Sequence, residues 1–126
     1  DLGIARCRLM TAGSGHDRRP ASAKMRVATK FVNVARAHYS ARGIQANIIK
    51  LYGAMELAPI MNLADEIVDI VDTGNTLKAN GMRPLEHIAD VSSRLIVNKA
   101  SMRTRNPIIA SLIEQISTAV ASRQGD

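Results

Sequence analysis

Cysteine and aromatic residues are scarce in this sequence. Cys7 is its one cysteine, tryptophan is absent, phenylalanine occurs once and tyrosine twice in 126 residues. A lone cysteine excludes an internal disulfide framework, and no Cys/His cluster has the spacing of zinc ligands. We therefore expect Cys7 to be a small buried hydrophobe, the core to be aliphatic and the compartment to be the reducing cytoplasm.

Long apolar runs are missing too. No uninterrupted run approaches the roughly 20 residues that a membrane-spanning helix needs, and no signal peptide is visible. Hydrophobic residues make up 46% and charged residues 22%, the balance of a globular protein that does not enter a membrane. The length allows one domain or one lobe of a larger one. Because the chain opens with Asp1 rather than Met, we expect a fragment.

The net charge of +6 is unevenly distributed. Residues 1–50 carry ten Lys or Arg against two Asp, whereas residues 51–80 carry one Lys against five acids. This division fits an anionic substrate held through a divalent cation, but a solvated surface would give the same pattern. Nucleic-acid binding is disfavoured because the sequence offers no aromatic platform and no recognition motif.

Hydrophobic periodicity predicts strands that alternate with helices. The predicted strands are residues 6–12, 24–29, 46–51, 67–71 and 87–98, the last interrupted at Ser92-Ser93. The predicted helical segments are residues 32–42, 55–58 and 73–79. Val32, Ala35 and Tyr39 would face the core, and Gly43 would end the first helix in a left-handed conformation. This order predicts an α/β fold with parallel strands and right-handed crossovers.

The last predicted element is an amphipathic helix. Asn106 suits the N-cap, and Pro107 suits the first helical position. Apolar residues then recur at helical spacing along one face: Ile109, Leu112, Ile113, Ile116 and Val120. We expect this face to pack on a surface outside the chain.

The segment from residue 66 to 77 carries the clearest chemistry. An apolar strand ends at Asp69 and Asp72, and a polar loop opens the next helix. The loop residues are Thr73, Gly74, Asn75 and Thr76. Backbone N–H groups at a helix start bind anions, and a glycine lets a phosphate approach closely. Carboxylates suit ribose hydroxyls or the hydration shell of Mg²⁺, so the segment indicates a phosphorylated sugar.

Other interpretations of this loop stay open. Strand-to-helix turns often contain these residue types, so the loop alone could be an ordinary capped turn. A phosphoribosyltransferase of the doubly wound fold would also explain it, and so would a ligand-binding lobe without catalysis. His16, His38 and His87 are interpreted as loop, helix-surface and strand-start residues rather than catalytic ones.

Several ordered segments together resemble the ATP phosphoribosyltransferases. The loop is similar to that family's phosphoribosyl-diphosphate loop, and three further stretches match in order. They are residues 24–31 (KMRVATKF), 51–59 (LYGAMELAP) and 93–98 (SRLIVN). The resemblance implies a type II periplasmic-binding-protein-like lobe, with a mainly parallel sheet flanked by helices and a C-terminal amphipathic helix. Residues 1–98 would form the second catalytic lobe, and residues 99–126 a returning helix that packs on a first lobe outside this chain.

The resemblance also implies a reaction and a set of roles. N1 of ATP would attack the anomeric carbon of 5-phosphoribosyl 1-diphosphate, and pyrophosphate would leave with help from Mg²⁺, in the first step of histidine biosynthesis. The loop residues 73–76 would hold the 5-phosphate. Asp69 and Asp72 would face ribose hydroxyls or the developing positive charge, and Glu56 would contact the ribose or Mg²⁺.

The sequence departs from the family pattern at two positions, and the resemblance also implies a partner subunit. Ala54 stands where the family usually has Ser, which removes a hydroxyl. Asn62 stands where it usually has Gly, and Asn tolerates a left-handed backbone best among the other residues. With no regulatory domain after the last helix, the chain resembles the short form, which assembles with a regulatory subunit related to histidyl-tRNA synthetase. Part of the ATP site would lie upstream of Asp1.

Overall fold

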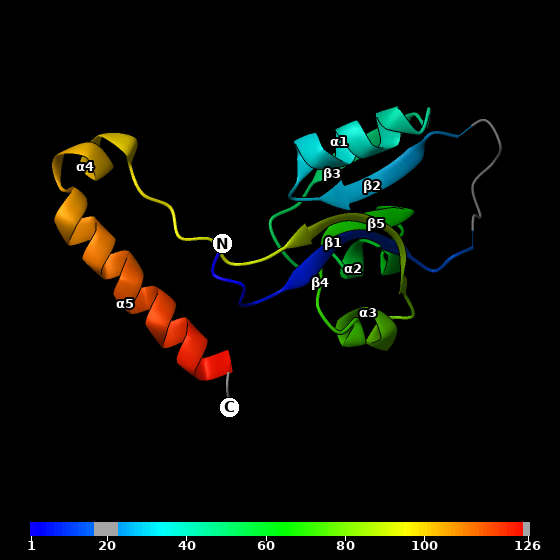
Figure 1. Ribbon diagram of the computed structural model, residues 1–126. Coiled ribbons are helices and arrows are strands. Elements are labelled where there is room, and N and C mark those ends of the chain that lie inside the picture. Colours follow the sequence, from blue (N-terminus) through cyan, green and yellow to red (C-terminus); the bar gives the residue numbers. More distant parts are fainter. Residues whose placement is uncertain (17–22, 125–126) are drawn as a thin grey trace. The chain divides into compact units, whose positions relative to one another are not determined.

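A computed structural model describes residues 1–16 and 23–124 (Figure 1). The chain divides into two compact units, residues 7–90 and a second unit made of residues 1–6 with 91–126. Residues 13–23, which separate the first two predicted strands, lie partly outside the described residues. Within the described part of the chain, no helix is long and apolar enough to cross a membrane.

The first unit contains a five-stranded mixed sheet. Its strands are β1 (Cys7–Gly13), β2 (Met25–Thr29), β3 (Ala46–Lys50), β4 (Glu66–Val71) and β5 (Arg83–Val91). Their order across the sheet is β3-β2-β4-β1-β5. The prediction of parallel pairing is confirmed for β2 with β3 and β2 with β4, but it is wrong for β1, which runs antiparallel to β4. Sequence periodicity indicates that a segment is a strand but does not indicate the direction in which it pairs.

Three helices cover the two faces of this sheet (Figure 1). Helix α1 (Val32–Ala41) lies on one face, while α2 (Leu57–Ile60) and α3 (Asn75–Ala79) lie on the other. On α1 the predicted inward residues Ala35 and Tyr39 are buried, and Gly43 ends the helix with a φ of +70°. The helical segment predicted at residues 55–58 lies two residues too early, because Pro59 falls in the first turn of α2, where its missing N–H is not needed.

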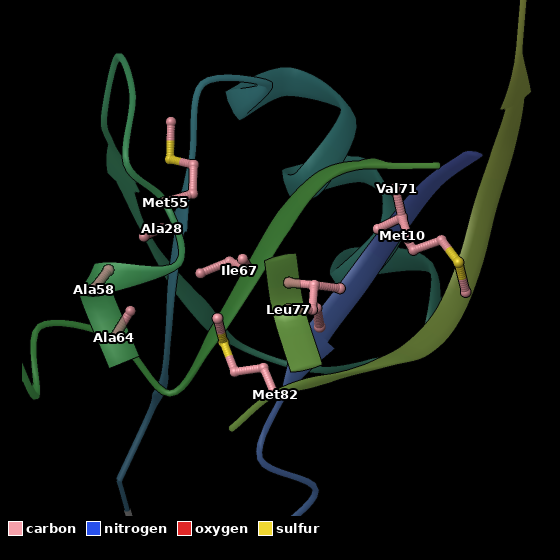
Figure 2. Packing of buried hydrophobic residues seen from close by; sticks show 10 residues of the cluster. Met10, Ala28, Met55, Ala58, Ala64, Ile67, Val71, Leu77 and Met82 are labelled. Carbon is pink, nitrogen blue, oxygen red and sulfur yellow. The ribbon is translucent and has the colours of Figure 1, made fainter. Parts of the chain in front are cut away.

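Strand β4 is buried on both faces at Ile67 and Val68, which explains the apolar sequence there, whereas Ile70 is 43% exposed. Ile67 and Val71 join a cluster with residues of α2 and α3, among them Ala58 and Leu77 (Figure 2). The alternate residues face α1, where the Tyr39 hydroxyl donates a 2.6 Å hydrogen bond to Glu66 Oε2. The core is aliphatic with several methionines, as the composition predicts.

Thr29 joins β2 to β4 through a fully buried hydroxyl. Its Oγ1 donates to the carbonyl oxygen of Val68 at 2.7 Å and accepts from the backbone N–H of Phe31 at 2.9 Å. The first bond crosses between strands, and the second fixes the turn from β2 into α1. One side chain therefore sets how both strands end at this edge of the sheet.

Arg26 clamps the opposite edge of the sheet. Its guanidinium donates to both carboxylate oxygens of Asp65, with a shortest distance of 2.9 Å, and to the backbone oxygen of Asn62 at 2.8 Å. The hydrogen bond to Asp65 raises the pKa of Arg26 above its ordinary value. Asn62 has a φ of +56°, so the predicted left-handed turn at this position is confirmed.

The C-terminal part differs from the prediction in three respects. Strand β5 begins earlier than expected, at Arg83, and contains Pro84, which an edge strand tolerates because one side of it needs no donor. Beyond Val91, residues 92–98 form no strand, and Ile96 is 88% exposed. A short helix α4 (Lys99–Thr104) was not predicted, although Asn98 caps it by accepting from Ala100 and Ser101 N–H groups.

The predicted terminal helix is confirmed as α5 (Asn106–Gln124). Most of the residues on its predicted apolar face are partly buried, but Leu112 is 53% exposed. None of the residues of α5 is fully buried. This helix therefore has little of its apolar side covered within its own unit.

Replacing Thr29 with Val should destabilise the full-length protein by about 1–3 kcal/mol, because the buried carbonyl of Val68 and the partly buried N–H of Phe31 each lose a partner. Thr29→Ser keeps the hydroxyl and removes one methyl group, which should cost about 0.8 kcal/mol. Urea unfolding of the two variants measures the difference. Equal destabilisation would mean that the hydroxyl contributes nothing.

Candidate active site

The predicted phosphate loop lies at the carboxyl edge of the parallel strands. Strand β2 connects through α1 to β3 on one side of the sheet, and β4 connects through α3 toward β5 on the other. Two neighbouring parallel strands whose connections diverge create a switch point, where open α/β sheets bind ligands. The loop after β4 stands at this point, so topology favours it independently of its sequence.

Gly74 gives the loop its shape. It has a φ of +82°, a left-handed conformation that glycine adopts without penalty. The hydroxyl of Thr73 accepts a 3.4 Å hydrogen bond from Asn75 N–H, and the Gly74 carbonyl accepts from Lys78 N–H at 3.0 Å. The helix begins at Asn75, two residues later than predicted. Because α3 has five residues its dipole is small, so the loop's own N–H and hydroxyl groups are the donors to consider.

The two carboxylates differ in their surroundings. Asp69 is partly buried on β4, and its Oδ1 accepts a 2.8 Å hydrogen bond from the N–H of Ile70. Asp72 is exposed and follows the last residue of the strand. Asp69 is therefore held by the sheet, whereas the Asp72 carboxylate is presented beside the loop. The structure brings both predicted acids to the loop because all belong to one segment.

Glu56 reaches the same face of the sheet from another segment. It precedes α2 and is partly buried, and its neighbour Met55 belongs to the hydrophobic cluster that also contains Val71 and Leu77. Ala54, where the resemblance expected Ser, has a φ of +52°. The role of Glu56 toward a ribose or Mg²⁺ stays a prediction.

The histidines contribute to packing and surface pairs. His38 Nε2 lies 2.9 Å from Glu86 Oε2, and His87 Nε2 lies 2.8 Å from Asp90 Oδ1. Among the residues that the structure describes, no group of three His, Cys, Asp or Glu gathers to hold a metal ion. A hydrated Mg²⁺ that is held mainly by phosphates needs only one or two protein carboxylates, so a role of the acids at the loop toward Mg²⁺ stays a prediction.

An open pocket of about 820 Å³ lies at the other edge of the sheet. Gly13, Met25, Glu66 and Arg83 line it, at the end of β1 and the beginnings of β2, β4 and β5. None of the predicted site residues lines this pocket. We place the candidate site at the loop rather than here, because the loop combines an open backbone, hydroxyls and carboxylates.

One residue near the loop was missed by sequence reasoning. Arg8 on β1 donates from Nη2 to the backbone oxygen of Asp72 at 3.5 Å. The two residues are 64 positions apart, and the pairing of β1 with β4 brings them together. No local pattern in the sequence signals such a contact.

Comparisons with known proteins agree on one family. The model described as HisG: ATP phosphoribosyltransferase matches residues 1–118. Proteins named ATP phosphoribosyltransferase are 66% identical over 125 residues in Chromohalobacter salexigens and 64% identical over 124 residues in Marinobacter nauticus. Each match covers 98% of this chain, which spans 57% and 58% of the length of these relatives.

A solved structure extends the likeness to the fold. The ATP phosphoribosyl transferase (HisG:HisZ) complex from Thermotoga maritima contains a chain that is 36% identical in sequence, with a TM-score of 0.83. The match covers 93% of this chain and 58% of that one. The mixed α/β sheet flanked by helices is thus shared with this complex.

Replacing Gly74 with Ala should destabilise the full-length protein by about 1–2 kcal/mol through its left-handed backbone alone. A Cβ at this position would meet its nearest atoms at 3.9 Å, so sterics add little. Gly74→Asn should cost less, since Asn tolerates this conformation. Gly53→Ala is the matched control, because Gly53 lacks a positive φ and has no atom within 4 Å of an added Cβ. If thermal unfolding shows that Gly74→Ala loses no more stability than Gly53→Ala, this explanation is contradicted.

Proposed function

Because the chain belongs to the ATP phosphoribosyltransferase (HisG) family, we propose that the full-length protein transfers the phosphoribosyl group of 5-phosphoribosyl 1-diphosphate to N1 of ATP. Pyrophosphate is released, and the reaction opens histidine biosynthesis. The observation that carries the proposal for this chain is the acid-flanked loop with its left-handed glycine at the switch point of the sheet.

The loop supplies the binding of the 5-phosphate in this proposal. Thr73, Gly74, Asn75 and Thr76 offer backbone N–H and hydroxyl donors, and the missing side chain of Gly74 leaves the backbone open to a phosphate oxygen. Because this phosphate does not react, its binding energy serves to orient the anomeric carbon toward the attacking nitrogen. The loop is therefore a positioning device rather than a source of acid or base.

The carboxylates act on the sugar. The transition state has oxocarbenium character, so a negative charge near the ribose stabilises it more than the ground state. Asp72 is exposed beside the loop and Asp69 is held by the sheet, so they are assigned to the developing positive charge and to the ribose hydroxyls. Mg²⁺, when bound to the diphosphate, would supply charge neutralisation of the leaving group, and Glu56 is the further candidate contact for the ribose or this ion.

In this proposal the chain supplies one of the two lobes of the full-length enzyme. We assign residues 1–98 to the second lobe of a type II periplasmic-binding-protein-like fold, and residues 99–126 to packing on the first lobe, which would supply part of the ATP site. A cytoplasmic hetero-oligomer with a histidyl-tRNA-synthetase-like regulatory subunit is part of the same proposal. It is supported by the similar chain of the Thermotoga complex, which contains HisG together with HisZ.

Asp72→Asn should lower turnover at saturating substrates by roughly tenfold to a hundredfold, because it removes a charge and keeps the size of the side chain. The measurement is steady-state kinetics of the full-length protein with its regulatory partner, following pyrophosphate release. The melting temperature should stay within about a degree of wild type, since the carboxylate is exposed.

Asp90→Asn is the control for this experiment, because Asp90 is an exposed carboxylate on β5 that pairs with His87. It should leave turnover unchanged. If wild type releases no pyrophosphate but binds the sugar phosphate, the chain is a binding lobe and the proposed reaction is wrong. If wild type is active and both variants match it, the reaction stands and Asp72 is misassigned.

Residues 1–126 alone should show no turnover with ATP, 5-phosphoribosyl 1-diphosphate and Mg²⁺. The chain spans little more than half of the relatives' length, and on α5 the side chains of Ile108 and Leu112 are 72% and 53% exposed. Uncovered apolar side chains promote association, so the purified piece should also self-associate in sedimentation experiments. Turnover at the rate of the full-length enzyme would contradict this expectation.

A further inference from the structure

Arg8 shares a sheet face with the site. In the antiparallel ladder, Arg8 pairs with Val71 and Met10 pairs with Asp69. Directly paired residues point to the same side of a sheet, and diagonal neighbours on that side are roughly 7–8 Å apart, within reach of long side chains. Arg8 and Asp69 are such diagonal neighbours. Met10 and Val71 belong to the hydrophobic cluster with residues of α2 and α3, so Arg8 and Asp69 lie on the face that carries these two helices.

The guanidinium of Arg8 is directed to the start of the loop. Its Nη2 contacts the carbonyl oxygen of Asp72, the residue before Thr73, at 3.5 Å. A hydrogen bond of this length contributes little energy. It therefore indicates the position of the Arg8 guanidinium but does not fix it there. Arg8 is exposed, which leaves the fork of N–H donors accessible to a ligand at the loop.

A nearby cation would favour the binding of a phosphate at the loop. The segment from Asp69 to Thr76 contains two acids and no Lys or Arg. A phosphate dianion placed beside two carboxylates is repelled, and neutral N–H donors compensate only in part. Arginine matches phosphate geometry with two parallel hydrogen bonds. Arg8 is placed to supply that charge from the neighbouring strand.

We propose that Arg8 is a substrate-binding residue that holds the 5-phosphate of the sugar substrate from the side opposite the loop's N–H groups. The proposal rests on the function proposed above. It adds to the loop a charged partner from β1, so that the phosphate is bound between two strands that pair antiparallel. The affinity for the sugar phosphate then depends on the β1–β4 register, whereas the affinity for ATP does not.

The test is steady-state kinetics of the full-length protein with its regulatory partner, with each substrate varied in turn. Arg8→Gln should raise KM for 5-phosphoribosyl 1-diphosphate roughly tenfold to a hundredfold, and change KM for ATP and kcat less than about twofold. Arg8→Lys should recover part of the loss, since it restores the charge but not the fork. A uniform fall in kcat with both KM values unchanged would indicate a structural role and overturn the proposal.

Lys24→Gln is the matched control, because it removes one exposed positive charge before β2, at the far edge of the sheet. If Arg8→Gln and Lys24→Gln behave alike, Arg8 contributes only to the general field and the proposal is wrong. If wild type is inactive, calorimetric titration of ribose 5-phosphate separates the two proposals. If wild type binds ribose 5-phosphate and Arg8→Gln does not, the role of Arg8 is supported even though the reaction is not. Equal binding to wild type and to Arg8→Gln, or no binding to wild type, overturns the proposal.

Discussion

Strand β4 and its two unlike neighbours determine where the chemistry can occur. On one side β4 pairs parallel with β2, which brings two carboxyl ends to the same edge and creates the switch point. On the other side it pairs antiparallel with β1, which brings an amino end to that edge. Ile67 and Val68 are buried on opposite faces, and a slip of one residue would exchange the side chains that pack toward α1 with those that pack toward α2 and α3.

The sequence predicts most strands and helices because each is marked locally. Tyr39 and Ala35 lie at helical spacing, and the apolar run before Asp72 is bounded by turn residues. The direction of β1 and the early start of β5 depend on partners that lie far away in the chain. The strand predicted through residue 98 failed for a related reason, because an apolar run such as Leu95 to Val97 forms a strand only where another strand offers hydrogen bonds.

The residues of the candidate site also divide into those marked locally in the sequence and those that depend on distant partners. The candidate loop could be proposed from sequence because its acids, hydroxyls and glycine are contiguous, and in the structure Gly74 has a left-handed φ of +82°. Arg8 could not be found, because its relevance arises from a register between strands 64 residues apart. Glu56 is intermediate between the loop residues and Arg8. Its segment matches a family pattern, but its distance from a ligand depends on the tertiary structure.

The uneven charge of the sequence has a partly structural origin. Arg26 is engaged by Asp65 and Asn62, Arg42 pairs with Glu86, and Glu66 accepts from Tyr39. Among these residues, the two arginines add to the positive charge of residues 1–50, and Asp65 and Glu66 add to the negative charge of residues 51–80, but they pair with each other or with other residues of the chain rather than with a ligand. Once they are assigned to the scaffold, the charges that remain near the loop include Asp69 and Asp72 of the loop segment and Arg8 of β1. A site with both signs of charge suits a substrate that is a phosphate anion at one end and a developing cation at its reacting carbon.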